Sequence, residues 1–222
     1  IWSLTILPSA INSNWFFLDD PDTVVTGAKV IQDLNSFIPT SIFGRYVPLY
    51  SYYRGVVFHI FGVSPIPSYI LQSMWILFSQ FLIYWIVKRL SGYRSAGLIA
   101  SLIFITGSGI AENAYTAGKP EPIVLLSLLL VTAASIILYK NKNSLVKNVI
   151  CFAVAVIFSI VAIWNKEPGL LIMLLGIGFL AGTIYYKTRN YLPAFAILLG
   201  VFLSRLPQLI YRPGRLNSDY TS

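Results

Sequence analysis

Long apolar stretches follow one another along most of this chain, and their length is what most restricts its fold. A helix that crosses the hydrocarbon core of a bilayer needs about 20 mostly apolar residues. Spans are predicted at 66–87, 95–114, 121–139, 145–164, 168–186 and 191–211, and residues 1–12 are predicted to end an earlier one. The sequence thus predicts an all-α polytopic membrane protein with about seven transmembrane helices.

The composition excludes an ordinary soluble domain. Of the 222 residues, 56% are hydrophobic and 11% are charged, and the mean hydropathy is +0.72. The net charge of +8 would favour nucleic acid in a soluble protein. Here the cations lie in short loops between apolar stretches, so they indicate topology and no nucleic-acid partner is predicted. The single cysteine, Cys151, lies in an apolar run and is predicted to serve packing.

Three of the loops are cationic and contain no acid. They follow the stretches that end near residues 87, 139 and 186, and their basic residues are Lys88, Arg89, Arg94, Lys140, Lys142, Lys147, Lys187 and Arg189. Lys and Arg in short loops mark the cytoplasmic side. All eight acidic residues are then predicted to face the lumen, the periplasm or the cell exterior.

Residues 13–65 are too polar for a span and are predicted to form an outer loop with two short helices lying on the membrane surface. The first begins with Asp20 as N-cap and Pro21 at its first position. The second covers about 49–61 and ends at Gly62. We expect residues 1–222 to form one module, an N-terminal part of a longer chain. The opening Ile1 in place of Met indicates a fragment.

The outer loop carries a cluster of three acids, Asp19, Asp20 and Asp22. Two adjacent carboxylates cannot both be buried and charged without a cation, so one can have a raised pKa that suits a general base. The alternative is that Asp20 only caps a helix and Asp19 is solvated. No metal site is predicted, because carboxylates at this spacing are common by chance and lack other hard ligands.

Cations on the same predicted face form a second group. Arg45 and Arg54 flank a tyrosine-rich segment, and Lys119 and Lys166 lie beside predicted helix N-termini. A helix N-terminus together with Lys or Arg is a natural receptor for phosphate. The alternative is anchoring at the membrane interface, where Tyr, Trp and Arg are enriched.

Other chemistries find no support in the sequence. His59 is the only histidine, which excludes a His-based metal triad and disfavours a Ser–His hydrolase. No P-loop, dinucleotide-binding or zinc-protease motif occurs. Soluble nucleotide chemistry is therefore not expected.

Several local motifs appear in an order that resembles one membrane enzyme superfamily. They are Phe17–Asp22, Arg45–Tyr50, Arg54–Gly62, Ala117–Glu121 and Asn165–Gly169. Together they resemble the membrane module of the GT-C glycosyltransferases, in the branch of the protein O-mannosyltransferases and the lipid A aminoarabinose transferase. The resemblance implies a seven-helix module whose large first outer loop carries two juxtamembrane helices. It also implies sugar transfer from a polyprenyl-phosphate donor on the outer face.

The resemblance also implies roles for individual residues. Asp19 would be the general base that takes the acceptor proton, and Asp20 would help to bind the acceptor or a metal. The donor phosphate would contact cations, and other carboxylates would support the site. The cations are Arg45, Arg54, Lys119 and Lys166, and the supporting acids are Asp22, Glu121 and Glu167. A divalent cation is a variable requirement in this superfamily and is not carried over to this chain.

Two motifs depart from the family pattern. Asn165 stands where O-mannosyltransferase-like members have Ser in a Ser-Lys-Glu turn, and Gly118–Glu121 resembles a Gly-Arg-x-Asp stretch. The sequence leaves the sugar and the acceptor open, whether protein, glycan or lipid. Two rival functions stay open: a non-catalytic scaffold subunit in a membrane complex, and a transporter. The transporter is the weaker, because no charge is predicted in the middle of a span.

Overall fold

The computed structural model describes residues 48–107, 119–140, 144–187 and 190–210, and within these ranges the chain is helical with no strand. The described elements are α3 (Pro48–Phe61), α4 (Pro65–Ser91), α5 (Arg94–Thr106), α7 (Glu121–Lys140), α8 (Leu145–Asn165), the 3-10 helix η2 (Glu167–Leu170), α9 (Leu171–Tyr185) and α10 (Leu192–Ile210). The all-α prediction is confirmed for these residues.

Three helices are long and apolar enough to cross a membrane: α4, α7 and α8. Helices α5 and α9, and α10 up to Pro207, are apolar but shorter. The chain is thus a membrane-associated helical protein, and the count of about seven spans stays a prediction. The predicted span at 1–12 and the predicted surface helix that begins at Asp20 lie outside the described residues.

Two predicted boundaries differ from the structure. The stretch predicted at 95–114 is helical only to Thr106 within the described residues, and the Thr106 hydroxyl donates to the carbonyl of Leu102. The stretch predicted to begin at 168 starts as a 3-10 turn, and the α-helix proper begins at Leu171. Gly169 accounts for the delay, because the chain folds back here so closely on α8 that a Cβ would overlap the backbone of Ala162.

The end of α3 agrees with the prediction from sequence. Gly62 has a φ of 73° and its N–H donates to the Phe58 carbonyl at 2.9 Å. This left-handed conformation is the usual way for a glycine to end a helix. Pro65 then starts α4, with Ser64 in extended conformation before it. The predicted helix at 49–61 is therefore confirmed.

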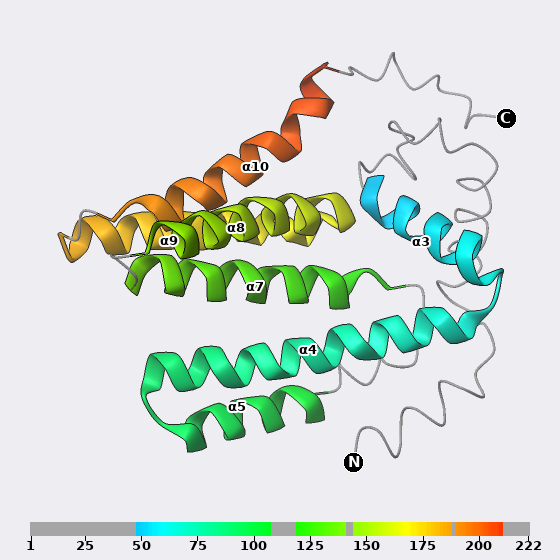
Figure 1. Ribbon diagram of the computed structural model, residues 1–222, viewed down its shortest axis with the longest axis horizontal. Coiled ribbons are helices and arrows are strands. Elements are labelled where there is room, and N and C mark those ends of the chain that lie inside the picture. The colour runs from blue at the N-terminus through cyan, green and yellow to red at the C-terminus, as the bar shows by residue number, and fades with distance from the viewer. Residues whose placement is uncertain (1–47, 108–118, 141–143, 188–189, 211–222) are drawn as a thin grey trace, which may run out of the picture.

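The long helices lie side by side, and their turns gather at two opposite ends (Figure 1). Helix α7 packs between α4 and α8, α5 packs on α4, and α10 packs on α8 and α9. The turns α4–α5, α7–α8 and α9–α10 share one end, here named the cationic end. Hydrogen bonds join these turns: Lys140 Nζ donates to the Arg89 carbonyl at 3.4 Å, and Asn190 Nδ2 to the Leu138 carbonyl at 2.9 Å.

The opposite end is here named the acid-bearing end, because Glu121 and Glu167, the two acids in the described ranges, belong to the start of α7 and to η2. Helix α3 lies at this end and packs against α4 and α8 (Figure 1). The cationic turns predicted to share a membrane side thus share an end of the molecule.

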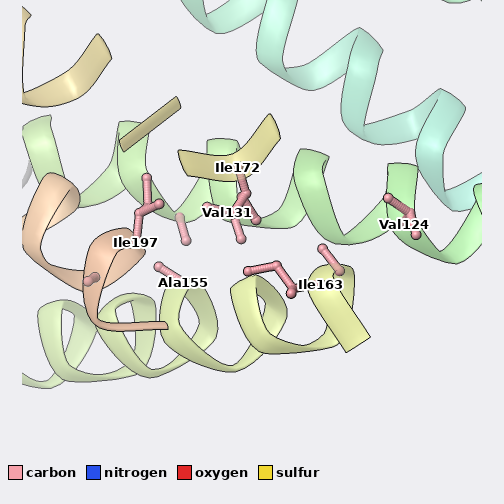
Figure 2. Packing of buried hydrophobic residues seen from close by; sticks show 9 residues of the cluster. Val124, Val131, Ala155, Ile163, Ile172 and Ile197 are labelled. Atoms are coloured by element: carbon pink, nitrogen blue, oxygen red, sulfur yellow. The ribbon is translucent and has the colours of Figure 1, made fainter. Parts of the chain in front are cut away.

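The core lies between α7, α8, α9 and α10 (Figure 2). Val131, Ala155, Ile172 and Ile197 are buried there, and Cys151 packs against this cluster as predicted. Gly200 allows close approach, because a Cβ at this position would lie 2.7 Å from the Val156 carbonyl oxygen. Small residues at helix contacts are typical of membrane proteins, in which close packing holds helices together.

Candidate functional site

An ion pair joins two turns that resemble each other in sequence. Lys166, which follows α8, forms an ion pair through Nζ with the carboxylate of Glu121 in the first turn of α7. The two side chains are 30% and 40% exposed. A carboxylate in the first helical turn also faces the positive end of the helix dipole. The structure therefore brings together two of the predicted site residues, 45 positions apart.

The turn after α8 fixes the position of Lys166. Its N–H donates to the Ala162 carbonyl at 3.4 Å, and its carbonyl accepts from Gly169 at 2.9 Å. Gly169 folds back so closely on α8 that a Cβ there would overlap the backbone of Ala162. Glycine is thus required at position 169 to bend the chain over the end of α8, which leaves Lys166 facing α7.

Buried polar atoms without a hydrogen bond surround this ion pair. Glu121 Oε2 is buried and has no hydrogen-bond partner. Asn165 is 1% exposed; its Nδ2 donates to the Val161 carbonyl at 2.7 Å, whereas its Oδ1 has no partner. A buried polar atom of this kind costs free energy unless something else binds it. The acid-bearing end therefore has unused hydrogen-bonding capacity.

Arg54 is the most unusual residue at this end. It lies on α3, its exposure is 0%, and its Nε and Nη1 have no hydrogen-bond partner. The guanidinium lies over the rings of Tyr53 and Tyr50, with centroid distances of 4.9 and 5.8 Å. Cation–π contacts stabilise the charge but leave the in-plane N–H groups available. Arg54 thus combines a buried charge with unused donors.

Tyr53 links Arg54 to the next helix. Its ring packs on Trp75 of α4 with centroids 4.9 Å apart, and its buried hydroxyl has no hydrogen-bond partner. Burial raises the pKa of the Tyr53 hydroxyl above 10.0; the charge of Arg54 opposes this shift and Tyr50 adds to it. The phenol therefore stays protonated at neutral pH and can donate a hydrogen bond.

These groups are suited to binding an anion. Helix α3, which carries Arg54, and the two helices that it packs against, α4 and α8, contain no Asp or Glu. A phosphate could accept from the guanidinium through one of its unpaired nitrogens, Nε or Nη1, and from the Tyr53 hydroxyl. Interfacial anchoring, the alternative for Arg54, requires a side chain that reaches the membrane boundary. The complete burial of Arg54 inside the protein disfavours it.

The other predicted site residues are less informative. Asp19, Asp20, Asp22 and Arg45 lie outside the described residues. Lys119 lies two residues before the start of α7 and is half-buried, and Glu167 belongs to η2. His59 is exposed near the end of α3. Within the described ranges no group of three or more His, Cys, Asp and Glu side chains could hold a metal ion.

Two residues were not predicted as members of the site, Tyr53 and Asn165. A signal for the tyrosines was present, since Tyr50 and Arg54 are four positions apart and share a helix face. Asn165 carried no comparable signal, because its burial depends on how η2 folds back. Comparisons with protein-family models, with curated proteins and with solved structures found no match to this chain.

Proposed function

We propose that this protein is a GT-C-like membrane glycosyltransferase that transfers a sugar from a polyprenyl-phosphate donor to an acceptor hydroxyl. In this proposal the chain forms a seven-helix module. Its acid-bearing end faces the lumen or the cell exterior, and its cationic end faces the cytoplasm. The order of the motifs and the gathering of the cationic turns at one end support this arrangement.

The burial of Arg54 with unused guanidinium N–H groups is the observation that carries the proposal. The ion pair found among the described residues, Lys166–Glu121, does not involve Arg54. A buried cation without an anionic partner is strongly unfavourable, and such a residue is a candidate for binding a ligand. A phosphate matches the planar geometry of the guanidinium. The proposed ligand of Arg54 is the phosphate of the donor.

The ion pair at the same end has a different role in this proposal. Glu121 neutralises part of the charge of Lys166 and positions its ammonium group at the end of α8. Lys166 then adds positive potential near the phosphate without competing for the position of Arg54. The partial exposure of both side chains keeps the pair accessible to an incoming headgroup.

The proposed reaction is an inverting displacement at the anomeric carbon. The acceptor oxygen forms the new glycosidic bond while its proton passes to Asp19. The bond between the anomeric carbon and the phosphate oxygen breaks, and polyprenyl phosphate leaves with the bonding electrons. Negative charge develops on this phosphate in the transition state. Arg54 stabilises that charge and so lowers the barrier.

Binding of a radiolabelled polyprenyl-phosphate sugar to the purified protein tests the proposal. We expect Arg54→Met to weaken binding at least about 100-fold, the effect of losing a buried charge-assisted pair of hydrogen bonds. Asp19→Asn should leave binding intact and abolish transfer. Wild-type transfer by Asp19→Asn, or unchanged binding by Arg54→Met, would contradict the proposal.

Arg89→Met is the matched control, because Arg89 is an exposed arginine at the cationic end. It should bind the donor as the unchanged protein does. The folding of Arg54→Met is checked by thermal unfolding in detergent. Its midpoint should not fall, because the substitution removes N–H groups that have no partner.

A further inference from the structure

A groove of about 550 Å³ runs along α7 and α9 and reaches the cationic end at Lys140 and Tyr186. Residues from α4, α7 and α9 line it: Leu90, Thr132, Ile136, Tyr139, Lys140, Leu174, Leu175, Gly178, Phe179, Gly182, Thr183 and Tyr186. Its volume is within the range of pockets that bury small ligands, roughly 300–1,000 Å³. It is remote from Arg54 and is not used in the proposed reaction.

The wall of this groove is apolar, and the hydroxyls of its two threonines are already hydrogen-bonded to backbone carbonyls. The hydroxyl of Thr132 donates to the Leu128 carbonyl at 2.8 Å, and that of Thr183 to the Phe179 carbonyl at 2.8 Å. Both threonines therefore satisfy their hydroxyls within their own helices. Such a wall suits a hydrocarbon chain, which needs contact area and no hydrogen bonds.

Two glycines keep the groove open on the α9 side. A Cβ added at Gly178 or at Gly182 would meet no atom within 4 Å. Both residues line the groove, one helical turn apart on the same face of α9. Their missing side chains leave a smooth channel between α7 and α9.

The rim of the groove is positively charged. Lys140 lines it, Arg89 directly precedes the lining residue Leu90, and Lys187 directly follows the lining residue Tyr186. Both acids in the described part of the chain, Glu121 and Glu167, belong to the opposite end. An anionic group in this part of the groove would therefore meet the ammonium group of Lys140 and none of the described carboxylates.

We propose that this groove is a binding site for an anionic phospholipid, with an acyl chain between α7 and α9 and the phosphate headgroup at Lys140. The apolar wall matches the acyl chain, and the cationic rim matches the phosphate headgroup. In a bilayer the headgroup likewise lies outward of the acyl chain. Tyr186 lines the groove and is 71% exposed, and aromatic residues of this kind favour the headgroup level of a bilayer. The site does not depend on the proposed transferase activity.

Titration of delipidated protein with dioleoyl phosphatidylglycerol and with dioleoyl phosphatidylcholine, followed by native mass spectrometry, tests the proposal. The two lipids share acyl chains and differ in headgroup charge. We expect the anionic lipid to bind about fivefold to tenfold more tightly, and Lys140→Gln to remove most of this preference. Equal affinity for the two lipids in the unchanged protein would overturn the proposal.

Gly182→Leu tests the acyl-chain channel. The leucine should fill the groove and weaken both lipids about tenfold, as expected when roughly two buried methylene groups lose their contacts. Ala181→Leu is the matched control, since Ala181 is exposed on α9 and does not line the groove. Gly178→Leu serves if Gly182→Leu does not fold. Unchanged lipid binding in a folded groove-filling variant would refute the site.

Glycerol 3-phosphate distinguishes a lipid site from a simple anion site. It carries the phosphate without the acyl chains, and we expect it to bind at least about 100-fold more weakly than phosphatidylglycerol, because it buries no methylene groups. Comparable affinity would show that the rim alone binds phosphate and would overturn the assignment of the groove.

Discussion

The two ends of the helical bundle use charge in opposite ways. At the acid-bearing end, Arg54 is fully buried and Lys166 is paired with Glu121. At the cationic end, Arg89, Lys140 and Lys187 are exposed around an apolar groove. Burying a cation has a large free-energy cost, whereas exposing one has almost none. The difference indicates that the identity of each charged residue matters at the acid-bearing end. At the cationic end only the total positive charge matters.

The largest effect is expected from a matched pair of glycine substitutions. Gly169→Ala, at the acid-bearing end, should lower the free energy of unfolding by about 3 kcal/mol, because its Cβ overlaps the backbone of Ala162. Gly182→Ala, at the cationic end, should raise it by about 0.5 kcal/mol, since the position is helical and open. Unfolding in detergent mixtures measures both values. Equal effects would show that the two ends are packed alike.

A smaller effect is expected from the ion pair. A double-mutant cycle of Glu121→Gln and Lys166→Met should give a coupling of about 0.5–1 kcal/mol, the usual range for a pair that is partly exposed. High salt should reduce it. Lys140→Met, at the cationic end, should change stability by less than about 0.5 kcal/mol. A coupling near zero would indicate that the two charges are held by other groups.

The smallest effect concerns alkaline pH. The folded-state pKa of Tyr53 is raised above 10.0 by burial, so the folded protein keeps this proton longer than the unfolded chain. The free energy of unfolding is then unaffected below pH 10 and falls as pH rises above it. Tyr53→Phe should make that alkaline fall shallower, as measured by unfolding midpoints between pH 9 and 11. Identical pH profiles would show that Tyr53 does not ionise in this range.

Local features of this fold could be predicted from sequence because they depend on neighbouring residues. Gly62 and the prolines after it predict where α3 ends, and the apolar stretches predict α4, α7 and α8. The predicted start at residue 168 lies three residues before the first residue of α9. Apolar periodicity could not predict the bend at Gly169 that delays the helix. The span count stays open, since α5 and α9 are shorter than the apolar stretches that contain them.

The contents of the site were harder to predict, because they depend on contacts between distant helices. The motifs that contain Glu121 and Lys166 were visible in the sequence, but the pairing of these two residues depends on how the ends of α7 and α8 meet. Arg54 was predicted as a phosphate ligand, whereas its complete burial was not. The groove was not predicted, since open space beside Gly178 and Gly182 depends on where α7 lies.

The hydrogen bond from Asn190 to the Leu138 carbonyl has a consequence for biosynthesis. The two residues are 52 positions apart, so the donor leaves the ribosome well after the acceptor. The same carboxamide reaches the Tyr139 carbonyl at 3.4 Å. The C-terminal turn of α7 therefore reaches its final hydrogen bonding only after α8 and α9 have been synthesised.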